Sequence, residues 1–209
     1  VGDPASYYKT AEKKCGTINI MLVIDADLPP GILARALVTC TEAKTAALQE
    51  LMAPSRYSMG LATGSGTDQT IVVANSESPL FFEGAGKHSK LGELIGLAVM
   101  AAVKEALKKQ SGLTPAQQHD LLRRLRRFGV TEEALWQRYK EEAGANALIK
   151  AQFIAALEKM TAVPSLFPLG VLFIHLYDEH LWGLLEKEET WEAAEKLLKE
   201  MAAALRLKT

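Results

Sequence analysis

Hydrophobic positions divide the chain into two parts of different texture. Up to about residue 110, short apolar runs alternate with longer stretches in which apolar residues recur at helical spacing, and most of the glycines lie here. From about residue 113 onward the pattern is almost wholly helical and rich in Ala, Leu, Glu, Lys and Arg. We therefore expect a mixed domain over residues 1–110 and an all-helical extension over residues 113–209.

Three short runs in the first part predict strands. Residues 18–24 form a short apolar run that only Asn19 interrupts and that contains β-branched residues, which is typical of a buried strand. Residues 57–62 and 70–74 flank a glycine-rich loop, so their pairing predicts an antiparallel hairpin. Apolar residues at helical spacing predict helices over 32–51 and 89–109. The expected fold class is α+β, a sheet with antiparallel pairing that these helices cover.

The loop between the last two predicted strands, residues 63–68, reads Thr-Gly-Ser-Gly-Thr-Asp. Its glycines allow the backbone to approach a ligand closely and to turn amide N–H groups outward, which suits a phosphate or an oxyanion. No Gly-Lys-Ser/Thr follows, so this is not a Walker loop. The alternative is a hairpin turn in which Thr63, Thr67 and Asp68 bond only their own backbone.

A histidine stands directly before the predicted helix at 89–109. His88 would lie near the unpaired backbone N–H groups and the positive dipole end of that helix. The alternative is a surface histidine beside an N-cap at Ser89. A capping box would need Glu or Gln at position 92, where Gly92 stands, so Glu93 has no capping role to explain it.

A lysine interrupts the apolar stripe of the predicted helix at 32–51. At about 100° per residue, Lys44 projects between Cys40 and Ala47, where lysine is seldom found unless it is paired. It is either a buried group that moves protons or stabilises negative charge, or a side chain that reaches past its small neighbours to water. Glu42 points to the opposite side, and we expect it to be solvated.

Two clusters in the helical part are weaker candidates. His175, Asp178 and Glu179 share a face if their segment is helical, which is a candidate metal set. A histidine satisfied within the core is the simpler interpretation. Four arginines with interleaved leucines predict a solvated helix face rather than a nucleic-acid surface. They are Arg123, Arg124, Arg126 and Arg127.

Charge and cysteine usage narrow the class of function. With 24 basic and 25 acidic side chains, no strong field would attract nucleic acid or an anionic membrane. Cys15 and Cys40 form no zinc-binding or redox spacing, which fits a reducing cytoplasm. Prolines and charged residues interrupt the most apolar stretch, 161–185, so we expect a core segment there and no membrane span.

Four segments in a fixed order carry a family resemblance: residues 16–20, 41–48, 62–68 and 84–96. Together they resemble the adenosylcobinamide amidohydrolase family of corrinoid salvage, over about residues 1–110. The resemblance implies hydrolysis of the amide that joins aminopropanol to the corrin ring, which releases adenosylcobyric acid. The corrinoid would be the substrate and not a cofactor.

Two departures from the family pattern stand out. Ser65 occupies a position where family members usually carry threonine, which preserves the hydroxyl group. Family members also usually have a longer N-terminal portion. We therefore expect residues 1–110 to be the C-terminal part of the family domain, completed by an upstream segment or by a second polypeptide.

These inferences place a hydrolytic site where the glycine-rich loop meets the start of the 89–109 helix. Ser65 or Thr67 would be the nucleophile or an oxyanion-site hydroxyl, and Lys44 would activate a hydroxyl or stabilise negative charge. His88 would be the general base and acid, oriented by Asp68. The residues expected to bind substrate are Asn19, Thr63, Gly64, Gly66, Lys90 and Glu93.

Two other functions stay open at this point. A corrinoid- or nucleotide-binding module without hydrolytic activity would use the loop as a ligand cradle. A metal-dependent amidase would use His88, Asp68 and Glu93. Our expectation is a small-molecule corrinoid substrate with no bound metal or cofactor, no nucleic-acid partner and no membrane partner. A homo-oligomer is compatible with it.

Overall fold

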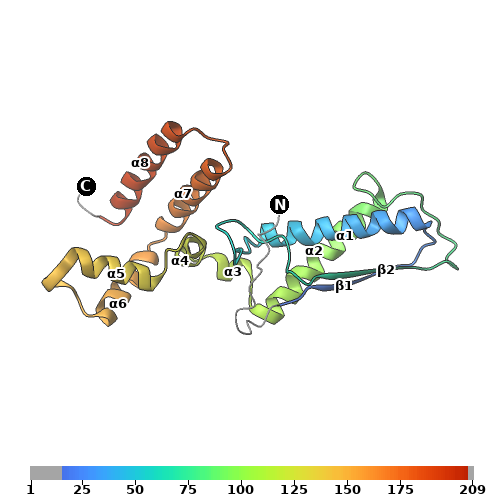
Figure 1. Cartoon of the computed structure of the whole chain (residues 1–209), viewed down its shortest axis with the longest axis horizontal. Coiled ribbons are helices and arrows are strands. Elements are labelled where there is room, and N and C mark those ends of the chain that lie inside the picture. The colour runs from blue at the N-terminus through green and yellow to red at the C-terminus, as the bar shows by residue number, and fades with distance from the viewer. Residues whose placement is uncertain (1–15, 207–209) are drawn as a thin grey trace. The chain divides into compact units, whose positions relative to one another are not determined.

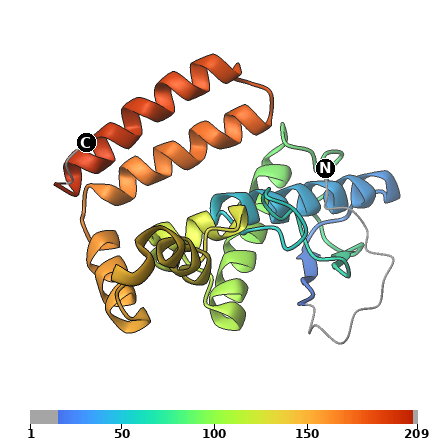
Figure 2. The ribbon, with the colours of Figure 1, turned by 60° about the vertical axis from the view of Figure 1, so that its left-hand side comes forward.

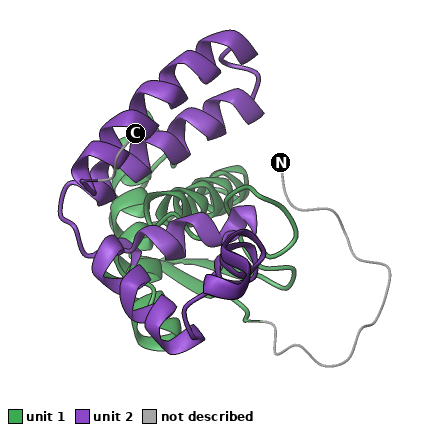
Figure 3. Ribbon diagram, turned by 90° about the vertical axis from the view of Figure 1, so that its left-hand side faces the viewer, with its two compact units in different colours: residues 1–117 green, residues 118–209 purple. Residues whose placement is uncertain are grey.

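A computed structural model describes residues 16–206 (Figure 1). Backbone contacts divide the chain into two compact units, residues 1–117 and residues 118–209, which Figure 3 distinguishes by colour. Cys15 lies outside the described residues. Each unit is treated by itself below.

Among the described residues, the sheet of the first unit has two strands. β1 spans Asn19–Ile24 and β2 spans Gln69–Ala74, and they pair in parallel and in register from first residue to last. Between them runs α1, Pro30–Glu50, which begins with a proline in its first turn. A helix between two strands returns the chain to the end of the sheet at which the first strand begins, so the second strand can run parallel to the first.

The predicted antiparallel hairpin is wrong, although the α+β class holds. Residues 57–62 form no strand, and only an isolated bridge joins Leu61 to Pro54. β2 pairs instead with β1, and α1 lies between these two strands in the sequence. The glycine-rich loop is therefore the entry to a parallel strand, not the tip of a hairpin.

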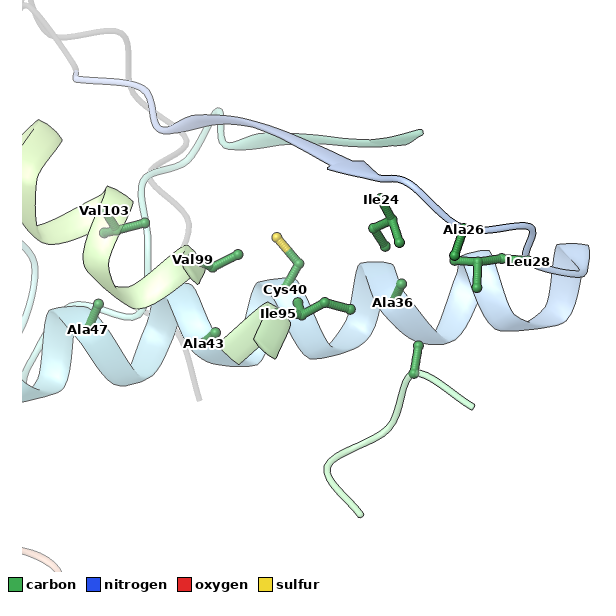
Figure 4. Close-up of a cluster of buried hydrophobic side chains, with 11 residues drawn as sticks. Ile24, Ala26, Leu28, Ala36, Cys40, Ala43, Ala47, Ile95, Val99 and Val103 are labelled. Carbon is green, nitrogen blue, oxygen red and sulfur yellow. The ribbon is translucent and has the colours of Figure 1, made fainter. Parts of the chain in front are cut away.

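α1 and the second long helix, α2 (Lys90–Ser111), pack with one face of the strands. Figure 4 shows side chains of α1, including Cys40, facing the strand across this core. The buried members are small and apolar, which allows close helix packing. They are Ile24, Ala26, Leu28, Ala36, Cys40, Ala43, Ala47, Ala85, Ile95, Val99 and Val103.

Both ends of α2 are capped. The Ser89 hydroxyl accepts a hydrogen bond from the Gly92 N–H at 3.1 Å, which satisfies one unpaired donor of the first turn. Gly112 follows the last turn with φ of +71°, the left-handed conformation that favours glycine. A side chain at Gly92 would overlap the Gly86 carbonyl, so the start of α2 sits directly against the preceding loop.

The second unit is helical. Figures 1 and 2 both show α7 and α8 side by side as a helical hairpin. Short 3₁₀ turns follow α4 and α5. The helices after residue 113 are α3 (Pro115–Gln118), α4 (Leu121–Leu125), α5 (Glu132–Ala143), α6 (Lys150–Thr161), α7 (Leu166–Leu181) and α8 (Lys187–Ala204).

An ion pair lies inside this second unit. Arg127 pairs with Asp178, and their side chains are only 4% and 5% exposed. The predicted solvated face is therefore wrong for Arg127, whereas Arg123 and Arg126 are exposed. A charge this deeply buried needs a partner, and each member supplies one to the other.

The histidine of the candidate metal set is not a core residue. The His175 side chain is 65% exposed, and its Nε2 lies 3.4 Å from a Glu179 oxygen. Asp178 is occupied by Arg127. Within residues 16–206, no three His, Cys, Asp or Glu side chains gather as a metal site.

One membrane test applies to the described helices. None of them alone is both long and apolar enough to cross a bilayer. α6 and α7 satisfy the length and composition criteria only as a pair, and they meet at an angle of 88°.

Candidate active site at the glycine-rich loop

Lys44 is buried on α1 and paired with a carboxylate. Its Nζ lies 2.5 Å from Asp68 Oδ2, and the two side chains are 10% and 11% exposed. Of the two alternatives that the sequence leaves open for Lys44, the structure has the buried one. The pair joins the middle of α1 to the end of the glycine-rich loop.

Asp68 is the centre of this site. Besides Lys44, three donors reach its carboxylate: the Ile18 N–H at 3.0 Å, the Ser65 N–H at 3.0 Å and the Ser65 hydroxyl at 2.5 Å. Burial raises the pKa of this carboxyl, but the bonds from Lys44, Ser65 and Ile18 outweigh burial and lower it below the ordinary value. Asp68 is therefore ionised at neutral pH, where it anchors the loop and holds the Ser65 hydroxyl.

Side chains of α1 and the start of β1 hold the rest of the loop. The Thr45 hydroxyl donates to the Thr63 carbonyl, and the Gln49 amide donates to the Ala62 carbonyl, both at 3.0 Å. The hydroxyl groups of Thr17 and Thr67 lie 2.5 Å apart. The loop is thus fixed at its beginning and at its end by side chains of other segments, and it is not a turn that bonds only its own backbone.

The two glycines of the loop differ in their surroundings. A methyl group at Gly64 would overlap both Asp68 Oδ2 and Lys44 Nζ, so the backbone here lies against the ion pair. Gly66 faces open space. Among the described residues, no acceptor bonds the backbone N–H of either glycine. Within the described residues, Gly64 therefore keeps an unpaired N–H on a loop that lies against the ion pair, and Gly66 keeps one two residues further along, an arrangement suited to an anion.

The loop before α2 carries His88 and is held on α1 at another point. The Thr39 hydroxyl donates to the Ala85 carbonyl at 2.8 Å, and Lys87 pairs with Glu42 at 3.0 Å. Glu42 is thus a partner of this loop, and its side chain is 40% exposed. His88 is exposed and lines an open depression together with Arg35.

The structure brings together some of the predicted residues and not others. Lys44, Ser65 and Asp68 form one cluster, with Gly64 against it. Within residues 16–206, no hydrogen bond joins His88 to this cluster. Three predicted substrate-binding positions lie outside the loop: Asn19 is exposed at the start of β1, and Lys90 pairs with Glu93 at 2.8 Å on the surface of α2.

Three residues of this region were not among those predicted. Thr17 bonds Thr67, Thr45 holds the loop, and Arg35 lines the depression beside His88. Thr45 had a sequence signal, because it follows Lys44 directly. Thr17 and Arg35 had none, since their partners are 50 or more residues away.

The fold and the loop define an α+β protein with a buried lysine–carboxylate pair against a glycine-rich loop. Residues 1–115, more than half of the chain, match the family model described as adenosylcobinamide amidohydrolase. The chain belongs to the adenosylcobinamide amidohydrolase family.

A curated relative carries the same region. Over 100 residues the chain is 46% identical to an uncharacterized protein of Methanocaldococcus jannaschii, a match that covers 47% of this chain and 38% of that protein. The chain thus corresponds to well under half the length of this relative. No solved structure matches the chain.

Proposed function

We propose that this protein hydrolyses the amide between aminopropanol and the corrin ring of adenosylcobinamide, which yields adenosylcobyric acid. Membership in the family supports the reaction class. The observation that carries the location is the buried Lys44 ammonium beside Asp68, with the unpaired N–H groups of Gly64 and Gly66 at the same loop. An amide carbonyl that becomes an oxyanion would find both a positive charge and backbone donors there.

The Ser65 hydroxyl is the proposed nucleophile. Its oxygen attacks the amide carbon, a C–O bond forms, and the C–N bond breaks as the nitrogen takes up a proton and leaves as aminopropanol. Water then hydrolyses the ester and restores the hydroxyl. Asp68 orients Ser65, while Lys44 and the two glycine N–H groups stabilise the oxyanion. Thr67, paired with Thr17, is the second hydroxyl at the loop.

His88 is the proposed proton carrier. It is exposed on a loop that Thr39 holds on α1, so substrate can reach it from solvent. In this role it takes the Ser65 proton and passes it to the leaving amine once the corrinoid spans the two loops. Lys90, Glu93 and Asn19 are polar groups on the surrounding surface that could contact such a large substrate.

The test is incubation of the purified chain with adenosylcobinamide, followed by mass-spectrometric detection of aminopropanol and adenosylcobyric acid. Ser65→Ala and His88→Ala should each lower turnover by about 10²-fold or more. Ser111→Ala, whose hydroxyl bonds only Leu107 in its own helix, is the matched control and should keep normal turnover. Turnover within a few-fold of normal in both site variants contradicts the assignment.

A second outcome separates catalysis from binding. If the chain binds adenosylcobinamide but returns it unchanged, the protein is a corrinoid-binding module. Loss of activity on thorough chelation would instead favour a metal-dependent amidase. Release of aminopropanol that resists chelation supports the proposed reaction.

A further inference from the structure

One face of the β1–β2 sheet has no cover among the described residues. Side chains alternate along each strand, so the helices cover one set and leave the other exposed. The exposed set includes Met21 at 74%, Val23 at 70%, Ile71 at 55% and Val73 at 45%. Asn19 and Gln69 complete this bare sheet face, which carries no charged side chain.

Within residues 16–206, β1 also has an open edge, with β2 on its other side. The carbonyls of Ile18 and Ile24 accept hydrogen bonds from the β2 side, from Gln69 and Asn75. Backbone groups of successive strand residues point to opposite edges, so Asn19, Met21 and Val23 direct theirs away from β2. Unpaired backbone groups in a row are a template for a further strand.

A groove of about 550 Å³ runs along this edge, between β1 and α2. Its floor on α2 is made of small and apolar residues, which leaves room for an extended segment above the helix. The α2 residues that line it are Ala98, Val99, Ala102, Val103, Ala106, Leu107 and Gln110. Its other wall is formed by residues 17–23, which are the first five residues of β1 and the two that precede them.

The bare sheet face and the groove have one physical explanation. Parallel strands occur almost only in sheets that are covered on both faces, because the helical crossovers bury them. Two strands alone are also a marginal sheet. Among the described residues, the parallel pair thus has an uncharged face and an unpaired edge. These two features indicate that the functional protein has a larger sheet.

We propose that this surface docks a polypeptide segment equivalent to the part of the Methanocaldococcus jannaschii relative that lies outside the match to this chain. The match covers only 38% of the Methanocaldococcus jannaschii protein, so most of that relative lies outside the match and contains residues for such a segment. The docked segment contributes one strand beside β1, with apolar side chains over Ala98 and Ala102, and a second element over Met21 and Val23.

This docking surface adjoins the candidate active site. The groove begins at Thr17, which bonds Thr67, and the next residue, Ile18, donates to Asp68. A strand beside β1 therefore starts next to the glycine-rich loop and can add residues to it. The inference concerns docking alone and does not rest on the hydrolysis proposed above.

The test uses the full 209-residue chain. The probe is a separate polypeptide comprising the residues of the Methanocaldococcus jannaschii relative outside the matched region, co-expressed or titrated with the chain. Amide hydrogen exchange is followed by NMR. The expected result is a one-to-one complex in which the amides of Asn19, Met21 and Val23 become protected at least tenfold.

Two variants and a control make the test specific. Met21→Lys and Val23→Lys place a charge on the bare sheet face, where the parent side chains are already at least 70% exposed, so the chain alone should fold normally. Each should weaken the complex at least tenfold. Leu97→Lys introduces the same charge at a 61% exposed position of α2 that does not line the groove, and it should leave binding unchanged.

Either of two results overturns the inference. One is the absence of a complex under co-expression. The other is self-association of the chain that protects the same β1 amides without the probe, because a second copy would then be the occupant. Neither result depends on turnover, so failure of docking is distinguishable from failure of the proposed reaction.

Discussion

The Nζ of Lys44 lies 2.5 Å from Asp68 Oδ2, with both side chains about nine-tenths buried. An ion pair removed from water contributes little net stability, because desolvation of the two charges offsets their attraction. Loss of one member is different, since the other charge is then buried without a partner. The pair therefore makes the position of the loop depend on α1, and both its stability and its chemistry can be tested through either residue.

Replacement of the lysine should destabilise the first unit. We expect Lys44→Met to lower the free energy of unfolding by about 3 kcal/mol, because Asp68 would keep its hydrogen bonds from Ser65 and Ile18 but lose its counter-charge. Urea unfolding followed by far-UV circular dichroism measures the change. Lys87→Met is the matched control: its pair with Glu42 is exposed, and its loss should cost less than about 1 kcal/mol. Equal effects of the two variants would contradict the prediction.

The ionisation of Asp68 should give stability a defined pH dependence. Its pKa in the folded protein is lowered, despite burial, by bonds from Lys44, Ser65 and Ile18. The unfolded value is about 3.9. The stabilisation is therefore complete above about pH 4 and is lost as the pH falls toward the folded value.

A comparison with Asp68→Asn isolates this contribution. Urea unfolding of the parent chain and of the variant is measured between pH 7 and pH 3. The advantage of the parent chain should be constant from pH 7 to about pH 5 and should shrink below about pH 4. An advantage that stays the same down to pH 3 would mean that Asp68 does not titrate as expected.

The sequence indicates Lys44 but not its partner. Its place in an apolar stripe follows from residues within two helical turns, and a buried position for lysine implies a counter-charge. Asp68 is 24 residues further along, and the glycine-rich loop marks it as a site residue without indicating that it pairs with Lys44. The bonds from Ile18 and Lys44 arise only when β1, α1 and the loop are assembled.

The direction of strand pairing was the larger error. The run at 57–62 is short and largely apolar, and it precedes a glycine-rich loop. These features together favour a hairpin. The competing signal was the order strand, helix, strand between β1 and β2, which favours parallel pairing through a crossover. The turn chemistry at 63–68 is a local signal, whereas the crossover determines how the two strands pair. Gly64 instead serves the close approach of the loop to the Lys44–Asp68 pair.

The two loop glycines provide a matched pair of variants. In Gly64→Ala the new methyl group would overlap Asp68 Oδ2 and Lys44 Nζ, so the loop must shift, at a cost of about 1–3 kcal/mol. Gly66→Ala adds the same methyl group in open space and should change stability by less than about 0.5 kcal/mol. Thermal unfolding of both variants is the measurement. A Gly64→Ala protein as stable as Gly66→Ala would show that the backbone is not held against the ion pair.

The Arg127–Asp178 pair allows the same reasoning to be tested in the second unit, with an optical probe that reports only there. All three tryptophans of the chain lie in residues 118–209. Arg127→Met removes the ion-pair partner of the buried Asp178. The free energy of unfolding, measured by tryptophan fluorescence in urea, should therefore fall by about 3–5 kcal/mol. Arg126→Met, one residue earlier and exposed, should lower this free energy by less than about 0.5 kcal/mol.

The double variant Arg127→Met with Asp178→Leu tests the cause of the loss. The buried carboxylate is gone in this variant, so most of the lost stability should return. If the double variant is no more stable than Arg127→Met alone, contacts of the arginine other than Asp178 account for the loss.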